Sequence, residues 1–161
     1  MLGWNAVGEV AHVKVSGLDI IASDCNAWKT PRAGNGAIVS LANIKDAKYR
    51  DIVIENVRSE VPVNQVFFLV TKGTAAGFDQ GLGDVDGLVF RNISVPGKPR
   101  LKGLFNGNGT NTGAIKNVTF DNVRIGGTLL TAENADQHIE QQGKTSEFTY
   151  TDSPANKSKS P

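Results

Sequence analysis

The sequence predicts an all-β protein, because a strand-like pattern recurs along its 161 residues and no segment sustains a helical period. In each copy, apolar residues two positions apart mark one face of a β-strand. The central apolar residues of the successive copies are Val15, Ile54, Phe90, Phe120 and, in a weaker fifth copy, Tyr150. Spacings of roughly 30 to 40 residues are too long for hairpins and too short for strand–helix–strand units with their loops.

A corner residue follows each of the first four central residues by two positions, and an apolar residue always comes next. The corner residues are Gly17, Asn56, Asn92 and Asn122. Asparagine tolerates the left-handed backbone that a sharp corner needs, and glycine adopts it more easily. Stacked asparagine side chains can also hydrogen-bond to one another from copy to copy. We therefore expect a structural ladder here, the alternative being four ordinary turn residues.

A second strand-like segment follows each corner. These segments span residues 37–41, 66–70, 101–105 and 128–131. They predict further walls of a coil, and hence a short, single-stranded, right-handed parallel β-helix of four to five coils. At about 4.8 Å between stacked strands, its length is roughly 20–25 Å. The handedness follows from the general preference for right-handed crossovers.

The chain has the length of one domain. We assign residues 1–150 to the β-helix, with residues 1–11 as a cap or interface segment. Residues 151–161 have a polar composition that predicts a flexible tail.

Composition excludes several classes of partner. The formal net charge is +1, and no basic face with interleaved aromatic residues predicts a nucleic-acid partner. No apolar run approaches the length of a membrane span. Residues 1–5 lack the basic start and apolar stretch of a signal peptide, so the chain as it stands is expected to be cytoplasmic unless a leader has been removed. The single cysteine, Cys25, allows no internal disulfide.

We expect neither a metal nor a cofactor. Residues 77–87 hold three aspartates and four glycines, but they lack the spacing of an EF-hand loop, which favours a surface turn over a calcium site. His12 and His138 have no further histidine or cysteine at ligand spacing, so zinc is not expected.

The segments Gly3-Trp4-Asn5 and Val13–Ile21, followed by the coils centred on Ile54, Phe90 and Phe120, resemble a known family. They look like the C-terminal coils of the dextranase and isopullulanase family of glycoside hydrolases, within the polygalacturonase-like β-helix group. The resemblance runs from about residue 2 to 150. It implies a right-handed β-helix and a relationship to secreted polysaccharide hydrolases.

The resemblance also implies that the family's catalytic acids, a cluster of consecutive aspartates, lie upstream of the Gly-Trp segment. This chain starts at that segment and contains no Asp-Asp pair, so no catalytic residue can be carried over. We expect the back half of such an enzyme. An open N-terminal end would expose strand edges and apolar interior, which residues 1–11 or a second copy would have to cover. We favour a homo-oligomer joined through that end.

Glycoside hydrolysis requires two carboxyl groups that face one groove. Glu55, Arg91 and Asp121 occupy matched outward positions on successive copies. Since Arg91 lies between the two acids and can pair with both, we interpret this row as a solvated charge ladder.

The first coil and its loop carry the candidate glycan-binding residues Trp4, Asp19, Asp24 and Trp28. A carboxylate beside an aromatic ring suits a sugar, because the ring covers the apolar sugar face while the acid accepts hydrogen bonds from hydroxyl groups. The alternatives are that Trp28 anchors the loop, Asp24 caps a turn and Trp4 covers the open core.

Three hypotheses for function follow. The first is a non-catalytic β-helix domain related to polysaccharide hydrolases, which binds glycan and self-associates. The second is a glycoside hydrolase acting on an α-glucan or pectin-like polysaccharide, with acids from Asp19, Asp24 or Glu9 completed across an oligomer interface. The third is a purely structural or protein-interaction module.

Overall fold

The computed structural model of the protein describes residues 8–22, 36–42, 47–71, 83–107 and 113–153. These residues form an all-β fold with one helical turn, and no helix in them is long and apolar enough to cross a membrane. In chain order the elements are β1 (Glu9–Ala11), β2 (Lys14–Ile20), β3 (Ala37–Ala42), β4 (Lys48–Ser59), β5 (Gln65–Val70), β6 (Val85–Val95), β7 (Gly103–Asn106), β8 (Ile115–Ile125), β9 (Thr128–Leu129), α1 (Ala135–His138), β10 (Ile139–Gln142) and β11 (Phe148–Thr151).

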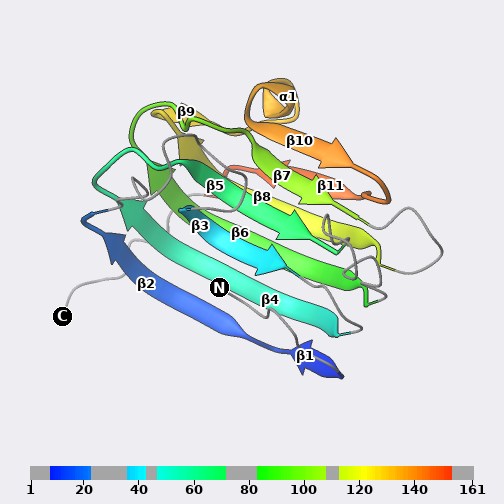
Figure 1. Ribbon diagram of the computed structural model, residues 1–161. Helices are drawn as coiled ribbons and strands as arrows, with labels where there is room; N and C mark the ends of the chain where they lie inside the picture. The colour runs from blue at the N-terminus through cyan, green and yellow to red at the C-terminus, as the bar shows by residue number, and fades with distance from the viewer. Residues whose placement is uncertain (1–7, 23–35, 43–46, 72–82, 108–112, 154–161) are drawn as a thin grey trace.

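The strands form two sheets. The first has the order β1-β4-β6-β8-β11, with β2 also paired to β4 and β9 to β8, and the second has the order β10-β7-β5-β3. From β2 to β8, consecutive strands of the chain belong alternately to the first and the second sheet (Figure 1). In the first sheet β2 therefore pairs with β4, β4 with β6 and β6 with β8, and in the second sheet β3 pairs with β5 and β5 with β7. The pairings are parallel apart from that of β8 with β9.

The register agrees with the alignment of the sequence copies. The five central apolar residues lie opposite one another across β2, β4, β6, β8 and β11, in the order Val15, Ile54, Phe90, Phe120 and Tyr150. The spacing of the repeat therefore fixes which residues become neighbours in the first sheet.

Aromatic rings fill the core between the sheets. Phe67 of the second sheet lies 4.7 Å from Phe90 and 5.4 Å from Phe120 of the first, measured between ring centroids. Phe105 contacts all three rings, and the four side chains are fully buried. Contacts between large rings thus join the two sheets across the core.

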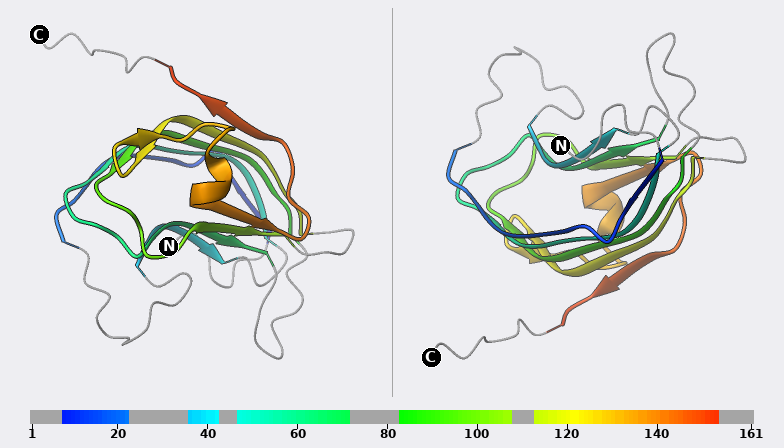
Figure 2. Two further views of the ribbon diagram at one scale, coloured as in Figure 1. Left: turned by 90° about the horizontal axis from the view of Figure 1, so that it is seen from above. Right: turned by 90° about the horizontal axis from the view of Figure 1, so that it is seen from below.

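The two ends of the core differ. At the C-terminal end, α1 lies across the space between the sheets, as Figure 2 shows, and Ala135 of α1 and Ile139 of β10 are buried. At the N-terminal end, most of β2 is exposed, and Leu18 and Ile21 are 43% and 71% exposed. Large apolar side chains therefore remain accessible at the N-terminal end.

The prediction that residues 128–131 form a further wall of the coil is wrong. Thr128 and Leu129 instead fold back as β9 and pair antiparallel with Ile125 and Arg124. The cause is local, because Gly126 and Gly127 have φ of 62° and 79°, the pair of positive values that a tight hairpin turn requires.

The place expected for residues 128–131 is taken by β10, which pairs with β7 in the second sheet. The other second-sheet segments correspond to β3, β5 and β7, although β7 begins at Gly103 rather than at residue 101. At the C-terminus, Thr151 still belongs to β11, one residue past the predicted end of the folded domain.

Replacing Phe67 with alanine should lower the free energy of unfolding by about 3–5 kcal/mol, because it removes a fully buried ring that contacts three others. The matched control is Phe148→Ala, since Phe148 is only half-buried at the end of the aromatic stack. Urea denaturation of both variants measures the difference. Equal losses would contradict the assignment of Phe67 to the centre of the core.

Candidate functional site

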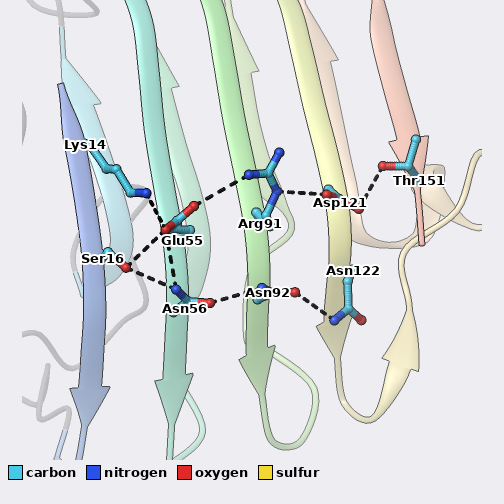
Figure 3. A network of polar contacts seen from close by, with 9 residues as sticks. All are labelled: Lys14, Ser16, Glu55, Asn56, Arg91, Asn92, Asp121, Asn122 and Thr151. Carbon is cyan, nitrogen blue, oxygen red and sulfur yellow. Dashed lines mark hydrogen bonds and ion pairs between the residues drawn. The ribbon is translucent and has the colours of Figure 1, made fainter. Parts of the chain in front are cut away.

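A polar row crosses the first sheet on the side opposite the aromatic core. Ser16, Glu55, Arg91, Asp121 and Thr151 lie opposite one another in register on β2, β4, β6, β8 and β11 (Figure 3). Each follows directly after a central apolar residue, so the alternation of a strand turns it away from the core. One row thus gathers side chains from five repeat copies.

The charges in this row alternate. The Glu55 carboxylate lies 2.8 Å from Lys14 Nζ and 3.6 Å from Arg91 Nη1. Arg91 Nε donates to Asp121 Oδ2 at 2.9 Å. The other oxygen, Asp121 Oδ1, accepts from Thr151 Oγ1 at 3.0 Å and from the Ser153 N–H at 2.9 Å. The predicted pairing of Arg91 with both acids is therefore confirmed.

The expectation that this row is solvated is wrong for its acids. The side chains of Glu55 and Asp121 are 12% and 5% exposed, whereas that of Arg91 is 45% exposed. The arginine lies between the two carboxylates, and the C-terminal residues Thr151 and Ser153 cover Asp121 further. Buried carboxylates need such partners, because an unpaired charge would be costly there.

Both acids are held in the ionised form. The hydrogen bond from Lys14 lowers the pKa of Glu55 and outweighs the opposing effect of burial. Burial raises the pKa of Asp121, but hydrogen bonds from Ser153, Arg91 and Thr151 together bring it below its usual range. A general acid at neutral pH requires the opposite shift, so neither carboxyl group suits proton donation to a leaving group.

An amide row lies beside the charge row, at the predicted corners. Gly17, Asn56, Asn92 and Asn122 have φ of 76°, 54°, 50° and 50°. Asn122 Nδ2 donates to Asn92 Oδ1 at 2.9 Å, and Asn92 Nδ2 donates to Asn56 Oδ1 at 3.0 Å. The predicted ladder is therefore present.

The two ends of the amide row are different. Gly17 has no side chain, and Asn56 Nδ2 instead donates to Ser16 Oγ at 3.1 Å. At the other end, Asn122 Oδ1 is buried and has no hydrogen-bond partner in the part of the chain that the structure describes. The hydrogen bonds of the row are therefore completed by Ser16 at β2, whereas an amide oxygen remains without a partner at β8.

A second line of left-handed residues escaped the sequence analysis. These residues stand one position before the first apolar residue of each copy and are His12, Asp51, Gly87, Asn117 and Glu147, with φ between 50° and 79°. Their position in the repeat is constant but their residue types vary. Only Gly87 and Asn117 are of types that commonly indicate a left-handed backbone. Gly87 packs closely, because a Cβ there would lie 3.3 Å from the Asp51 backbone nitrogen.

Of the predicted glycan-binding residues, the structure describes one. Asp19 accepts a hydrogen bond from Arg58 Nε at 3.1 Å on the exposed side of β2. Trp4, Asp24 and Trp28 lie outside the described residues, as do Cys25 and residues 1–7 of the expected cap. The candidate acid Glu9 pairs with Arg50 at 3.0 Å.

In the described part of the candidate calcium loop, both aspartates bind other groups of the protein. Asp84 accepts from the Ala114 N–H at 2.9 Å, and Asp86 accepts from Asn117 Nδ2 at 2.6 Å and pairs with Lys116. Residues 77–82 lie outside the described ranges. Across those ranges, no group of three or more potential metal-ligating side chains gathers.

Comparison with protein-family models, with curated proteins and with solved structures gives no significant match for this chain.

Asn92 should contribute both through its amide and through its tolerance of the left-handed backbone. Asn92→Gly removes two ladder hydrogen bonds and should lower the free energy of unfolding by about 1–3 kcal/mol. Asn92→Ala should cost about 1 kcal/mol more, because alanine is strained at a φ of 50°. Chemical denaturation of the two variants separates the effects. A fully stable Asn92→Gly variant would show that the ladder adds nothing.

Asp121 should make stability depend on pH in the acid range. Because its pKa is lower in the folded state, its stabilisation is complete above the unfolded pKa of about 3.9 and is lost as the pH falls through the folded value. Asp121→Asn should cost about 2–3 kcal/mol at neutral pH and flatten the loss of stability below about pH 4.

The control for Asp121 is Glu60→Gln, which affects an exposed ion pair with Arg58 and should change stability by less than about 1 kcal/mol. Unfolding free energies measured from pH 7 to pH 2 test both variants. An unchanged acid dependence in Asp121→Asn would rule out this residue as its source.

Proposed function

We propose that the chain is a short right-handed parallel β-helix, related to the dextranase-like polysaccharide hydrolases, that acts as a non-catalytic, glycan-binding and self-associating module. The β-helix assignment is supported by the alternation of strands between two sheets and by their parallel, in-register pairing. Its handedness follows the general crossover preference.

One observation carries the non-catalytic part of the proposal: Arg91 lies between Glu55 and Asp121 and pairs with both. These acids occupy the matched positions at which two coils could offer a catalytic pair. Hydrolysis needs one carboxyl group that is protonated and one that is free to attack or to activate water. Here both are ionised and engaged, so the row serves to hold neighbouring strands together.

Glycan binding is supported by an aromatic groove at the C-terminal end. It has a volume of about 460 Å³, within the range of ligand sites, and contains the half-buried rings of Phe148 and Tyr150. Thr131, Glu133 and Asp152 supply polar groups at its edge. Ring faces and hydroxyl-binding acids together suit a sugar.

Self-association is supported by the N-terminal end. Within the described residues, β2 pairs only with β4 and β3 only with β5, so both have a second edge without a strand. Leu18 on β2 and Ile21 directly after it add exposed apolar surface. A second copy related by a twofold axis would bring this end against itself and cover it.

Glycan binding should depend on the Tyr150 ring. Calorimetric titration with dextran, pullulan and polygalacturonate oligosaccharides should detect binding of at least one, weakened about tenfold in Tyr150→Leu by loss of the ring face. Phe68→Leu is the matched control, because Phe68 is a partly exposed ring on the other sheet. Binding of no glycan would refute this part of the proposal.

Self-association should depend on the apolar N-terminal end. Light scattering should give the mass of a dimer for the unmodified protein and of a monomer for Ile21→Glu, since two buried charges would face each other across the twofold axis. A monomeric unmodified protein would refute the interface. A dimer that binds no glycan would favour a pure assembly module.

A further inference from the structure

A second cavity lies away from both the polar row and the aromatic groove. It has a volume of about 220 Å³ and lies between the segment that precedes β7 and the end of α1. Its lining includes Lys98, Arg100, Lys102 and His138, together with Val66 and Ile125. Val66 and Ile125 are buried and provide an apolar floor, while the cationic side chains belong to exposed residues.

This pocket concentrates positive charge along one wall. Six other described lysines and arginines form ion pairs, namely Lys14, Arg50, Arg58, Arg91, Lys116 and Arg124. In the described ranges, no carboxylate forms an ion pair with Lys98, Arg100 or Lys102. Three cations thus surround one cavity in a chain whose formal net charge is only +1.

The wall that carries these cations is fixed in place. The Leu101 N–H donates to the Asn64 carbonyl at 2.9 Å, which holds the segment against β5. Lys102 Nζ donates to the backbone carbonyl of Asp136 at 2.7 Å, which joins the wall to α1. A preformed wall lowers the entropic cost of binding a ligand.

We propose that this pocket binds a small oxyanion, presented either as free phosphate or sulfate or as the carboxylate of an acidic sugar. The guanidinium fork of Arg100 suits two oxygens of one anion, and Lys98 and Lys102 add point charges beside it. The cavity is smaller than the 300–1,000 Å³ typical of larger ligands, which matches a single anionic group.

His138 makes binding depend on pH. Burial and the neighbouring Lys98 and Lys102 lower its pKa, with Asp136 opposing them, so the free pocket holds a neutral imidazole at neutral pH. A bound anion favours the imidazolium form. The affinity for sulfate and galacturonate, whose own charge is constant in this range, should therefore rise as the pH falls from about 7.5 to about 5.5, and His138→Gln should remove that dependence.

Titration calorimetry with inorganic phosphate, sulfate and galacturonate, each as a separate ligand, tests the pocket. At least one anion should bind, about tenfold more weakly to Arg100→Gln and to Lys98→Gln and more weakly at higher salt. Both substitutions affect exposed side chains, so the fold should persist. Lys48→Gln is the matched control, because Lys48 is an exposed cation on β4 that lies outside the pocket.

The three ligands separate the sources of the anion. Preference for galacturonate assigns the pocket to acidic sugars, and preference for phosphate or sulfate assigns it to free anions. Failure of all three to bind, or equal binding by Arg100→Gln and the unmodified protein, would overturn the inference. Neither failure bears on the aromatic groove, because its neutral ligands dextran and pullulan are tested separately by Tyr150→Leu.

Discussion

The strict parallel register of β4, β6 and β8 is the constraint on which the rest of the structure depends. In such a stack, each side chain lies next to the equivalent side chain of the following repeat. The side chains at one repeat position must therefore pack or pair favourably with one another. Interior rows satisfy this with stacked rings, as Phe90 and Phe120 do at 5.5 Å. The corner row satisfies it with an amide, which both donates and accepts. A row of like charges would fail, and the row of Glu55 therefore alternates in sign.

The repeat in the sequence was sufficient to predict β2, β4, β6, β8 and β11 of the first sheet, because alternation and spacing are local properties that register converts directly into contacts. The same reasoning failed where the chain leaves the repeat. Gly126 and Gly127 turn β9 back on β8, and β10 was missed because Ile139 is the one apolar residue in a segment that otherwise reads Glu-Gln-Gln. Its strand is specified by pairing with β7 rather than by its own pattern.

The ion pairs of the polar row could be predicted from the sequence, but the burial of its two carboxylates could not. Alternation places Glu55, Arg91 and Asp121 on one face, and opposite charges then imply contact. How much water reaches Asp121 depends on Thr151 and Ser153, which come from about 30 residues further along the chain. The basic pocket was missed for a related reason, because His138 and Arg100 are brought together only by the packing of α1.

The two polar rows respond differently to a change in the number of repeats. The amide row is a one-way chain in which each asparagine donates toward β2, so a duplicated repeat would enter it without altering any neighbour. In the charge row, acidic and basic residues alternate from Glu55 to Asp121, so the sign of an added residue matters. A copy of the repeat that carries Arg91 would place two arginines side by side, whereas two added repeats of opposite sign would restore the alternation. Duplications of the charged repeats within this row should therefore be tolerated in pairs rather than singly.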